Sequence, residues 1–153
     1  MKLSEALALR ADANKRIAEL SERMVQSAKT QEGTDPAEDA TALLAQADEL
    51  ATTLQKLIAD INKTNLATKL TDGRTLTEAI AERDILLVRI SMYRRLADAG
   101  LIKQTVQTRS EVRFVPLVDV PKLRRQTDDL SRDHRELDAL IQAANWATEL
   151  LEN

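Results

Sequence analysis

The chain has no cysteine, and its 153 residues include only three glycines, three prolines and one each of Phe, Tyr and Trp. The absence of cysteine excludes disulfides, thiol catalysis and zinc sites built on thiolates. The scarcity of glycine and proline argues against loop-rich and all-β folds. Because aromatic residues make up only 2% of the chain, its core must consist of Leu, Ile, Val and Ala. A charged fraction of 31%, with abundant Ala and Leu, suits long helices.

Several functional signatures are also missing. The sequence contains no Gly-rich phosphate loop, no G-x-S-x-G elbow and no H-E-x-x-H pair. Its first residues mix acids and bases without an apolar run, so we expect no signal peptide. The densest apolar run, residues 85–88, is too short to cross a bilayer. We therefore expect a cytoplasmic, non-membrane protein with no cofactor and no catalytic residue that the sequence singles out.

Apolar periodicity predicts four long helices. In the strongest pattern the spacings alternate between four and three, which places every member on one stripe of a helix. The members of this seam are Leu43, Ala47, Leu50, Leu54, Leu57 and Ile61. We predict helices over residues 3–29, 36–62, 76–98 and 121–151. On the first helix, Arg10 and Asn14 interrupt the inward face, so we expect looser or partly polar packing there.

Capping signals locate the turn between the first two helices. Asp35-Pro36-Ala37-Glu38 offers an N-cap acceptor, a proline at the first helical position and a glutamate three residues after the cap. Gly33 is placed to end the preceding helix. The first two helices should therefore form an antiparallel pair joined by a short loop.

The third predicted helix is apolar in nearly every direction around its axis. Its apolar and aromatic positions are Ile85, Leu86, Leu87, Val88, Ile90, Met92, Tyr93 and Leu96. A helix of this kind is normally surrounded by other helices. We expect it to form the buried centre of the protein, within the chain or shared with a second subunit.

Between the last two helices the composition favours β structure, and we predict a hairpin over residues 103–118 with strands near 103–108 and 112–118. Pro116 lacks a donor, so the second strand should present an edge there. The predicted fold is mainly α: one domain, residues 1–153, in which four long antiparallel helices pack as in a coiled coil around one inserted hairpin.

His134 is the single histidine, and it lies on the apolar stripe of the last helix. It is a candidate metal ligand or proton acceptor, with Asp133, Glu136 and Asp138 nearby in the sequence. One histidine per chain makes a strong metal site only when oligomer symmetry brings copies together. The favoured interpretation is a polar residue that fixes helix register.

A basic cluster, Lys122, Arg124 and Arg125, lies at the start of the last helix, where the helix dipole disfavours positive charge. It could contact an anion or nucleic acid. The favoured alternative is pairing with the acidic second helix of a neighbouring subunit, because no aromatic stacking platform accompanies the bases. Trp146, the single tryptophan, should cap the core of the chain itself, with a subunit interface as the second choice.

Surplus apolar surface predicts a homo-oligomer, with a dimer as the minimum. A two-stranded hairpin is marginal alone, and its apolar side chains are too many to leave in water. We expect the interface at Val112, Phe114, Val115 and Leu117, whereas in a monomer the hairpin would fold back over its own helices. The first functional hypothesis is a non-enzymatic oligomeric scaffold or interaction module that pairs with itself. The alternatives are a nucleic-acid or polyanion-binding protein, and a metal-dependent enzyme with a site at a symmetric interface.

Several segments together resemble a family of small bacterial helical proteins of unknown function that are often called septicolysin-like. They are Lys2-Leu3-Ser4-Glu5-Ala6-Leu7, Arg10-Ala11-Asp12, Ile61-Asn62-Lys63-Thr64-Asn65, Asp72-Gly73-Arg74-Thr75-Leu76, Ala81-Glu82-Arg83-Asp84, Val118-Asp119-Val120 and Ala144-Asn145-Trp146. The resemblance covers most of the chain and implies a helical bacterial protein. It implies no established activity, so it assigns no catalytic residue.

Overall fold

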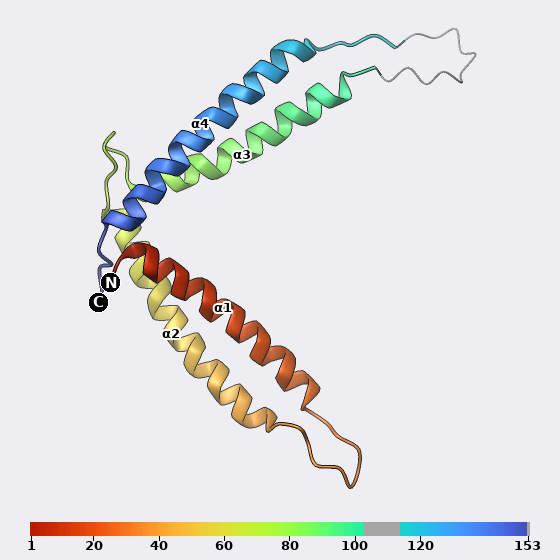
Figure 1. The fold of residues 1–153 in the computed structure, drawn as a ribbon, viewed down its shortest axis with the longest axis vertical. Helices are drawn as coiled ribbons and strands as arrows, with labels where there is room; N and C mark the ends of the chain where they lie inside the picture. The colour runs from red at the N-terminus through yellow and green to blue at the C-terminus, as the bar shows by residue number, and fades with distance from the viewer. Residues whose placement is uncertain (103–113, 153) are drawn as a thin grey trace, which may run out of the picture. The chain divides into compact units, whose positions relative to one another are not determined.

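The computed structural model describes residues 1–102 and 114–152 and is mainly helical (Figure 1). Its helices are α1 (Leu3–Gln26), α2 (Ala40–Ala67), α3 (Leu76–Ala99) and α4 (Val120–Ala147). All four predicted helices are therefore present. The chain divides into two compact units, one of residues 1–76 with 143–153 and the other of residues 77–142. That the whole chain is one domain stays a prediction.

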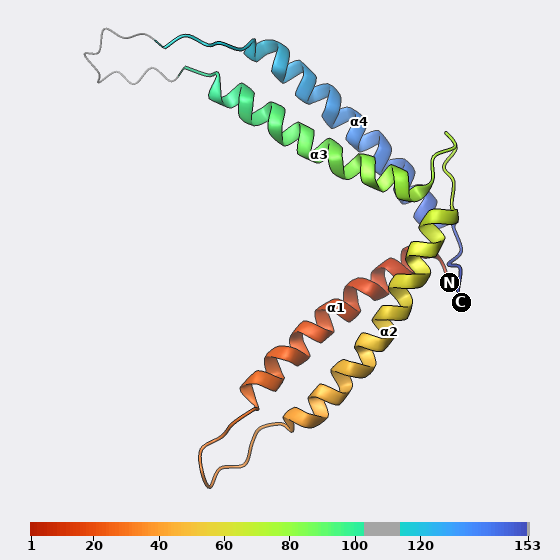
Figure 2. The same cartoon turned by 180° about the vertical axis from the view of Figure 1, so that it is seen from behind.

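In the first unit, α1 and α2 lie side by side and run antiparallel (Figures 1 and 2). The predicted seam of α2 faces α1, since Leu43 and Ala47 are buried in one cluster with Leu20 of α1. Ile61, at the other end of the seam, is fully buried. The middle of the seam is only half-buried, which indicates that the two helices pack tightly at both ends and loosely between them.

The second helix begins four residues later than predicted. The carboxylate of Asp39, not that of Asp35, caps it by accepting hydrogen bonds from Thr41 N at 2.8 Å and Ala42 N at 3.3 Å. Glu38 does not cap the helix, because its carboxylate accepts a hydrogen bond from Arg23 Nε at 3.0 Å. That contact ties the loop to the end of α1 and leaves Asp39 as the first free acceptor before the helix.

The first helix ends at Gln26, not at residue 29, so Gly33 does not terminate it. Gly33 does adopt a positive φ of 83°, a conformation that favours glycine, but it does so inside the turn that links α1 to α2.

The two chain ends meet in the first unit. The predicted last helix continues to residue 151, whereas α4 stops at Ala147. Beyond it, Thr148 O accepts from Leu3 N at 2.9 Å, and Leu150 N donates to Met1 O at the same distance. The helix ends early because these backbone groups pair with the N-terminal segment.

In the second unit, α3 and α4 lie side by side (Figures 1 and 2). Leu86 and Ile90 of α3 are buried, as are Leu137 and Ile141 of α4. Two ion pairs join the helices, Arg83 Nη1–Asp138 Oδ1 at 3.4 Å and Arg124 Nη2–Asp98 Oδ1 at 3.6 Å. Only one face of α3 is buried. The prediction that this helix is surrounded by others is therefore not met by the described part of the chain.

The predicted β-hairpin is not supported. The described residues contain isolated β-bridges but no strand, and residues 103–113, with the first predicted strand, lie outside them. Residues 114–118, the described end of the second predicted strand, are irregular. Pro116 removes one donor from this short segment, and no neighbouring strand among the described residues is available to pair with it.

Candidate functional site

The main candidate site is the outer face of α3, defined here as Ile85, Val88, Met92 and Leu96. Spacings of three and four residues place these side chains on one stripe, opposite buried Ile90. Each has an exposed fraction between 48% and 60%. A continuous row of large, half-exposed apolar side chains on a two-helix unit is typical of a surface that binds another protein.

Charge is distributed unevenly along α3. Its first half carries the acids Glu78, Glu82 and Asp84, whereas its second half carries the bases Arg89, Arg94 and Arg95. One further base, Arg83, is occupied within the unit, since it donates to Asp84 and to Asp138. Its hydrogen bond with Asp84 raises the pKa of Arg83 above its ordinary value. The helix is thus acidic towards its start and basic towards its end.

The predicted interface residues continue this apolar surface. Val112 lies outside the described residues, but Phe114, Val115 and Leu117 are exposed, with fractions of 81%, 70% and 94%. They line a hollow of about 410 Å³ together with Leu96, the last member of the outer face of α3. The residues predicted from the sequence lie in the segment after α3 and do not include the helix face itself. The all-round apolar pattern of the helix was the signal for it.

The predicted anion-contact residues lie on the first turns of α4. Lys122, Arg124 and Arg125 are all exposed. The helix is capped by Asp119, whose Oδ1 accepts from Lys122 N at 2.9 Å. Arg124 is paired with Asp98 of the same chain, so one of the three bases already has an acidic partner.

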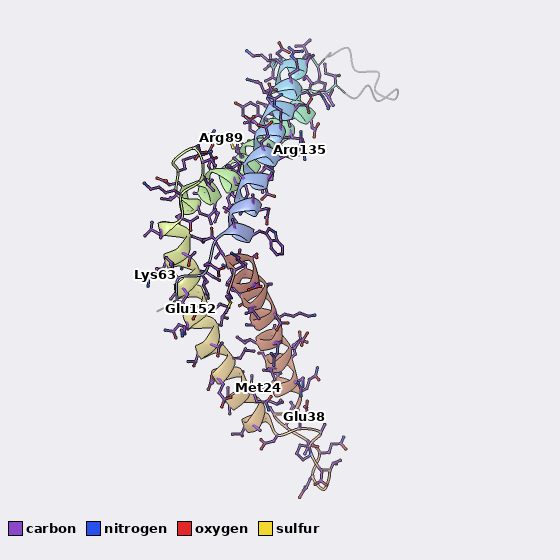
Figure 3. All side chains as sticks on the ribbon, turned by 60° about the vertical axis from the view of Figure 1, so that its left-hand side comes forward. Met24, Glu38, Lys63, Arg89, Arg135 and Glu152 are labelled. Atoms are coloured by element: carbon purple, nitrogen blue, oxygen red, sulfur yellow. The ribbon has the colours of Figure 1, made fainter. Side chains whose placement is uncertain are left out.

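His134 is half-buried and lines a hollow of about 360 Å³ between α3 and α4. Arg94, Arg95 and Arg135 line the same hollow, and Figure 3 labels Arg135 on α4. The hollow also includes one acid, Asp98, so its three guanidinium groups leave a net positive charge that repels a metal cation and attracts an anion. In the part of the chain that the structure describes, no group of three or more His, Cys, Asp or Glu residues could hold a metal ion.

Trp146 does not cap the core of the chain, since 68% of its surface is exposed. Its neighbour Asn145 is buried instead. The prediction that Trp146 caps the core is therefore wrong.

Together these elements define a mainly α-helical protein with two pairs of long helices. The model of the family of unknown function DUF6847 matches residues 10–150, so the chain belongs to that family. The crystal structure of a functionally unknown conserved protein from Corynebacterium diphtheriae is similar, with 39% sequence identity over 99% of each chain and a TM-score of 0.93. No curated protein matches. Among the described residues, none of the helices has the length and apolarity that a membrane crossing requires.

Proposed function

We propose that this protein is a non-enzymatic interaction module that pairs with a second copy of itself through the outer face of α3. The observation that carries the proposal is the stripe of Ile85, Val88, Met92 and Leu96, which stays about half exposed within its own unit. A second copy presents the same stripe, and a twofold axis lets two identical apolar faces cover each other.

The size of the apolar surface favours a weak, concentration-dependent pair. Fully burying one such side chain contributes about 1.5–3 kcal/mol, so covering its exposed half contributes roughly 1 kcal/mol. A symmetric pair covers four side chains from each copy, for a total of about 8 kcal/mol. Association costs about 4–15 kcal/mol in lost freedom of movement. At the lower end of that cost about 4 kcal/mol remains, which corresponds to a dissociation constant of about 1 mM. We therefore expect monomer and dimer to exchange in the millimolar range.

Charge favours an antiparallel arrangement of the two α3 helices. Residues 84 and 95 are three helical turns apart and lie on the same side of the stripe, and same-side residues meet across an antiparallel pair. The pair Asp84 and Arg95 and the stripe from Ile85 to Leu96 are both centred near residue 90. An antiparallel contact that superimposes the two stripes therefore places Asp84 of each copy, which already accepts from Arg83 of its own chain, beside Arg95 of the other.

Sedimentation velocity over a concentration series that extends to about 1 mM tests the pairing. For the wild type we expect the average mass to rise from 17.1 kDa towards twice that value. The double variant Val88→Asp, Met92→Asp should remain a monomer because it places four charges in the contact. The matched control is Leu140→Asp, which changes an exposed apolar residue on α4 and should pair like the wild type. A wild-type mass of 17.1 kDa at every concentration would overturn the proposal.

Two further variants locate and orient the contact. Arg95→Glu should weaken pairing, and adding Asp84→Arg to it should restore pairing, because the reversed charges again face each other in the antiparallel arrangement. Phe114→Asp tests whether the interface extends to the segment after α3, which is where the sequence analysis placed it. Dissociation by Phe114→Asp, with no effect of the stripe variants, would assign the contact to that segment.

A second candidate function is polyanion binding in the second unit. It is supported by the hollow that Arg94, Arg95 and Arg135 share with His134, and by the exposed bases at the start of α4. Retention on a polyanion column should fall steeply with salt. The variant Arg94→Gln, Arg135→Gln should elute earlier than the control Arg10→Gln, Arg16→Gln, which removes the same charge from α1. Equal elution of the two variants would exclude the hollow as the polyanion-binding site.

The resemblance to septicolysin-like proteins implies no established activity and leaves both candidate functions unchanged. A cytoplasmic location remains part of the proposal, because a weak homodimer depends on the concentration that a confined compartment provides.

A further inference from the structure

A separate groove lies between α1 and α2 in the first unit, at the middle of the pair where the seam is loosely packed. Its volume is about 370 Å³. It is lined mainly by apolar side chains, namely Leu9, Ala13, Leu50, Leu54, Leu57 and Leu150. The sequence predicted loose packing here because Arg10 and Asn14 interrupt α1. Asn14 turns back onto its own helix, with Nδ2 donating to Arg10 O at 3.0 Å, and so does not fill the space.

One buried acid lines this groove. Asp60 has an exposed fraction of only 2%, and its Oδ1 has no hydrogen-bond partner among the described residues. Buried carboxylates are normally paired with a cation or hydrogen-bonded, because burying an unpaired charge is very unfavourable. Lys56, one helical turn earlier, also lines the groove, but within the described part of the chain no ion pair joins it to Asp60. Oδ1 is therefore covered and lacks the partner that a bound cation could supply.

Asp60 differs from the other buried oxygens without a partner. Those atoms are Ser4 Oγ, Asn65 Oδ1 and Asn145 Oδ1. All three belong to neutral groups, for which one ordered water is a sufficient partner. A carboxylate carries a full charge and is better compensated by a cation. The lining of the groove also includes two further acids, Asp12 and Glu152, and two bases, Arg16 and Lys56.

We propose that this groove binds a small organic cation with an apolar body, of which a primary alkylammonium is the simplest example. The ammonium group donates to Asp60 Oδ1, and the alkyl chain lies among the leucines of α1 and α2. A volume of about 370 Å³ lies at the lower end of the range for small-molecule sites. The groove belongs to the first unit and uses no residue of the α3 face, so this inference is independent of the proposed pairing.

Titration calorimetry with three eight-carbon probes tests the charge preference. The probes are n-octylammonium, octanol and octanoate, each used below its micelle-forming concentration. We expect octylammonium to bind about tenfold or more tightly than octanol, which corresponds to one charge-assisted hydrogen bond. Octanoate should bind most weakly. Equal affinity for octylammonium and octanol, or no binding of any probe, would overturn the proposal and leave Asp60 as a hydrated acid.

The variant Asp60→Asn tests whether Asp60 is the residue that binds the ammonium group. It should remove the preference for octylammonium over octanol while keeping the affinity for octanol. Its matched control is Asp12→Asn, which removes the same charge elsewhere in the lining of the groove and should keep most of the preference. An unchanged preference in Asp60→Asn would contradict the assignment. If Asp60→Asn fails to fold, methyl NMR of the wild type decides instead, since octylammonium should shift the signals of Leu54 and Leu57 and leave that of Leu137, in the other unit, unchanged.

Discussion

The two helix pairs differ in how much of their apolar surface they cover themselves. In the α1–α2 pair, the seam of α2 faces α1, and Leu43 and Ala47 are buried against it. In the α3–α4 pair, α3 is apolar on two opposite sides, with Ile90 buried and Met92 exposed. The α1–α2 pair covers its main seam but leaves individual apolar side chains exposed, such as Leu44 at 48% and Leu66 at 67%, whereas the α3–α4 pair retains a continuous exposed row.

This difference shows what apolar periodicity can and cannot indicate. The pattern of a helix gives the number of its apolar faces. It does not tell whether each face is covered by the same chain. For α2 there is one dominant face and one neighbouring helix. For α3 there are two faces and one neighbouring helix within its unit, and the excess face is the reason that we propose a second copy as its partner.

The largest predicted difference in stability is between substitutions on the two faces of α3. Ile90→Ala removes buried methyl groups next to α4 and should lower the free energy of unfolding by about 2–5 kcal/mol. Ile85→Ala makes the same change on the outer face and should cost less than about 1 kcal/mol in dilute solution, where the protein is monomeric. Urea denaturation of both variants measures the difference. Equal losses would mean that the outer face is covered within the chain.

A second matched pair sharpens the comparison inside the first unit. Leu43→Ala, in the tightly packed part of the seam, should cost about 2–5 kcal/mol. Leu54→Ala, in the wall of the groove, should cost less, about 1–2 kcal/mol, because its side chain is already partly exposed. The same urea experiment serves for both variants. A Leu54→Ala loss as large as that of Leu43→Ala would show that the groove is closed in solution.

The sequence was sufficient for the existence and order of the four helices and for the direction of the α2 seam, because these depend on local spacing. It also indicated where α1 and α2 would pack loosely. It did not indicate that Asp60 would be buried in that region without a partner. An acid next to the apolar residue Ile61 resembles an ordinary surface residue, and its burial depends on the C-terminal segment that Leu150 anchors to Met1.

Other failures had a similar origin in contacts between distant residues. Asp35 has better local cap signals than Asp39, but its loop is tied to α1 by the bond between Arg23 and Glu38, and α2 begins only after Asp39. The predicted end of α4 failed because the residues after Ala147 pair with the N-terminus. β propensity over the described residues 114–118 was equally unreliable, since a strand needs a partner strand that propensity alone does not provide.

Substitutions at the start of α2 should have a smaller effect on stability. Asp39→Ala removes the acceptor for two backbone N–H groups and should lower the free energy of unfolding by about 1 kcal/mol. Asp35→Ala removes an acid of the same type from the exposed loop and should change stability by less than about 0.5 kcal/mol. Chemical denaturation at neutral pH compares them. A larger loss for Asp35→Ala would return the start of the helix to the position that the sequence predicted.

The smallest predicted effect is a change in the pKa of Glu38, in the loop that joins α1 to α2. Met24 and Glu38 lie at the same end of the unit (Figure 3). Hydrogen bonding from Arg23 lowers the pKa of Glu38 below its ordinary value. The folded protein therefore holds this proton less tightly than the unfolded chain does. The bond stabilises the fold above the ordinary carboxyl pKa, and this contribution is lost as the pH falls through the lowered value.

Arg23→Gln removes the charged donor, so the pKa of Glu38 should rise towards its ordinary value. Carboxyl NMR titration measures the shift directly. Glu149 is the internal control, because its pKa is lowered chiefly by Lys2 at the opposite end of α1 and should not change in this variant. If the Glu38 pKa is the same in both proteins, Arg23 does not hold the loop in solution, and the late start of α2 rests on the Asp39 cap alone.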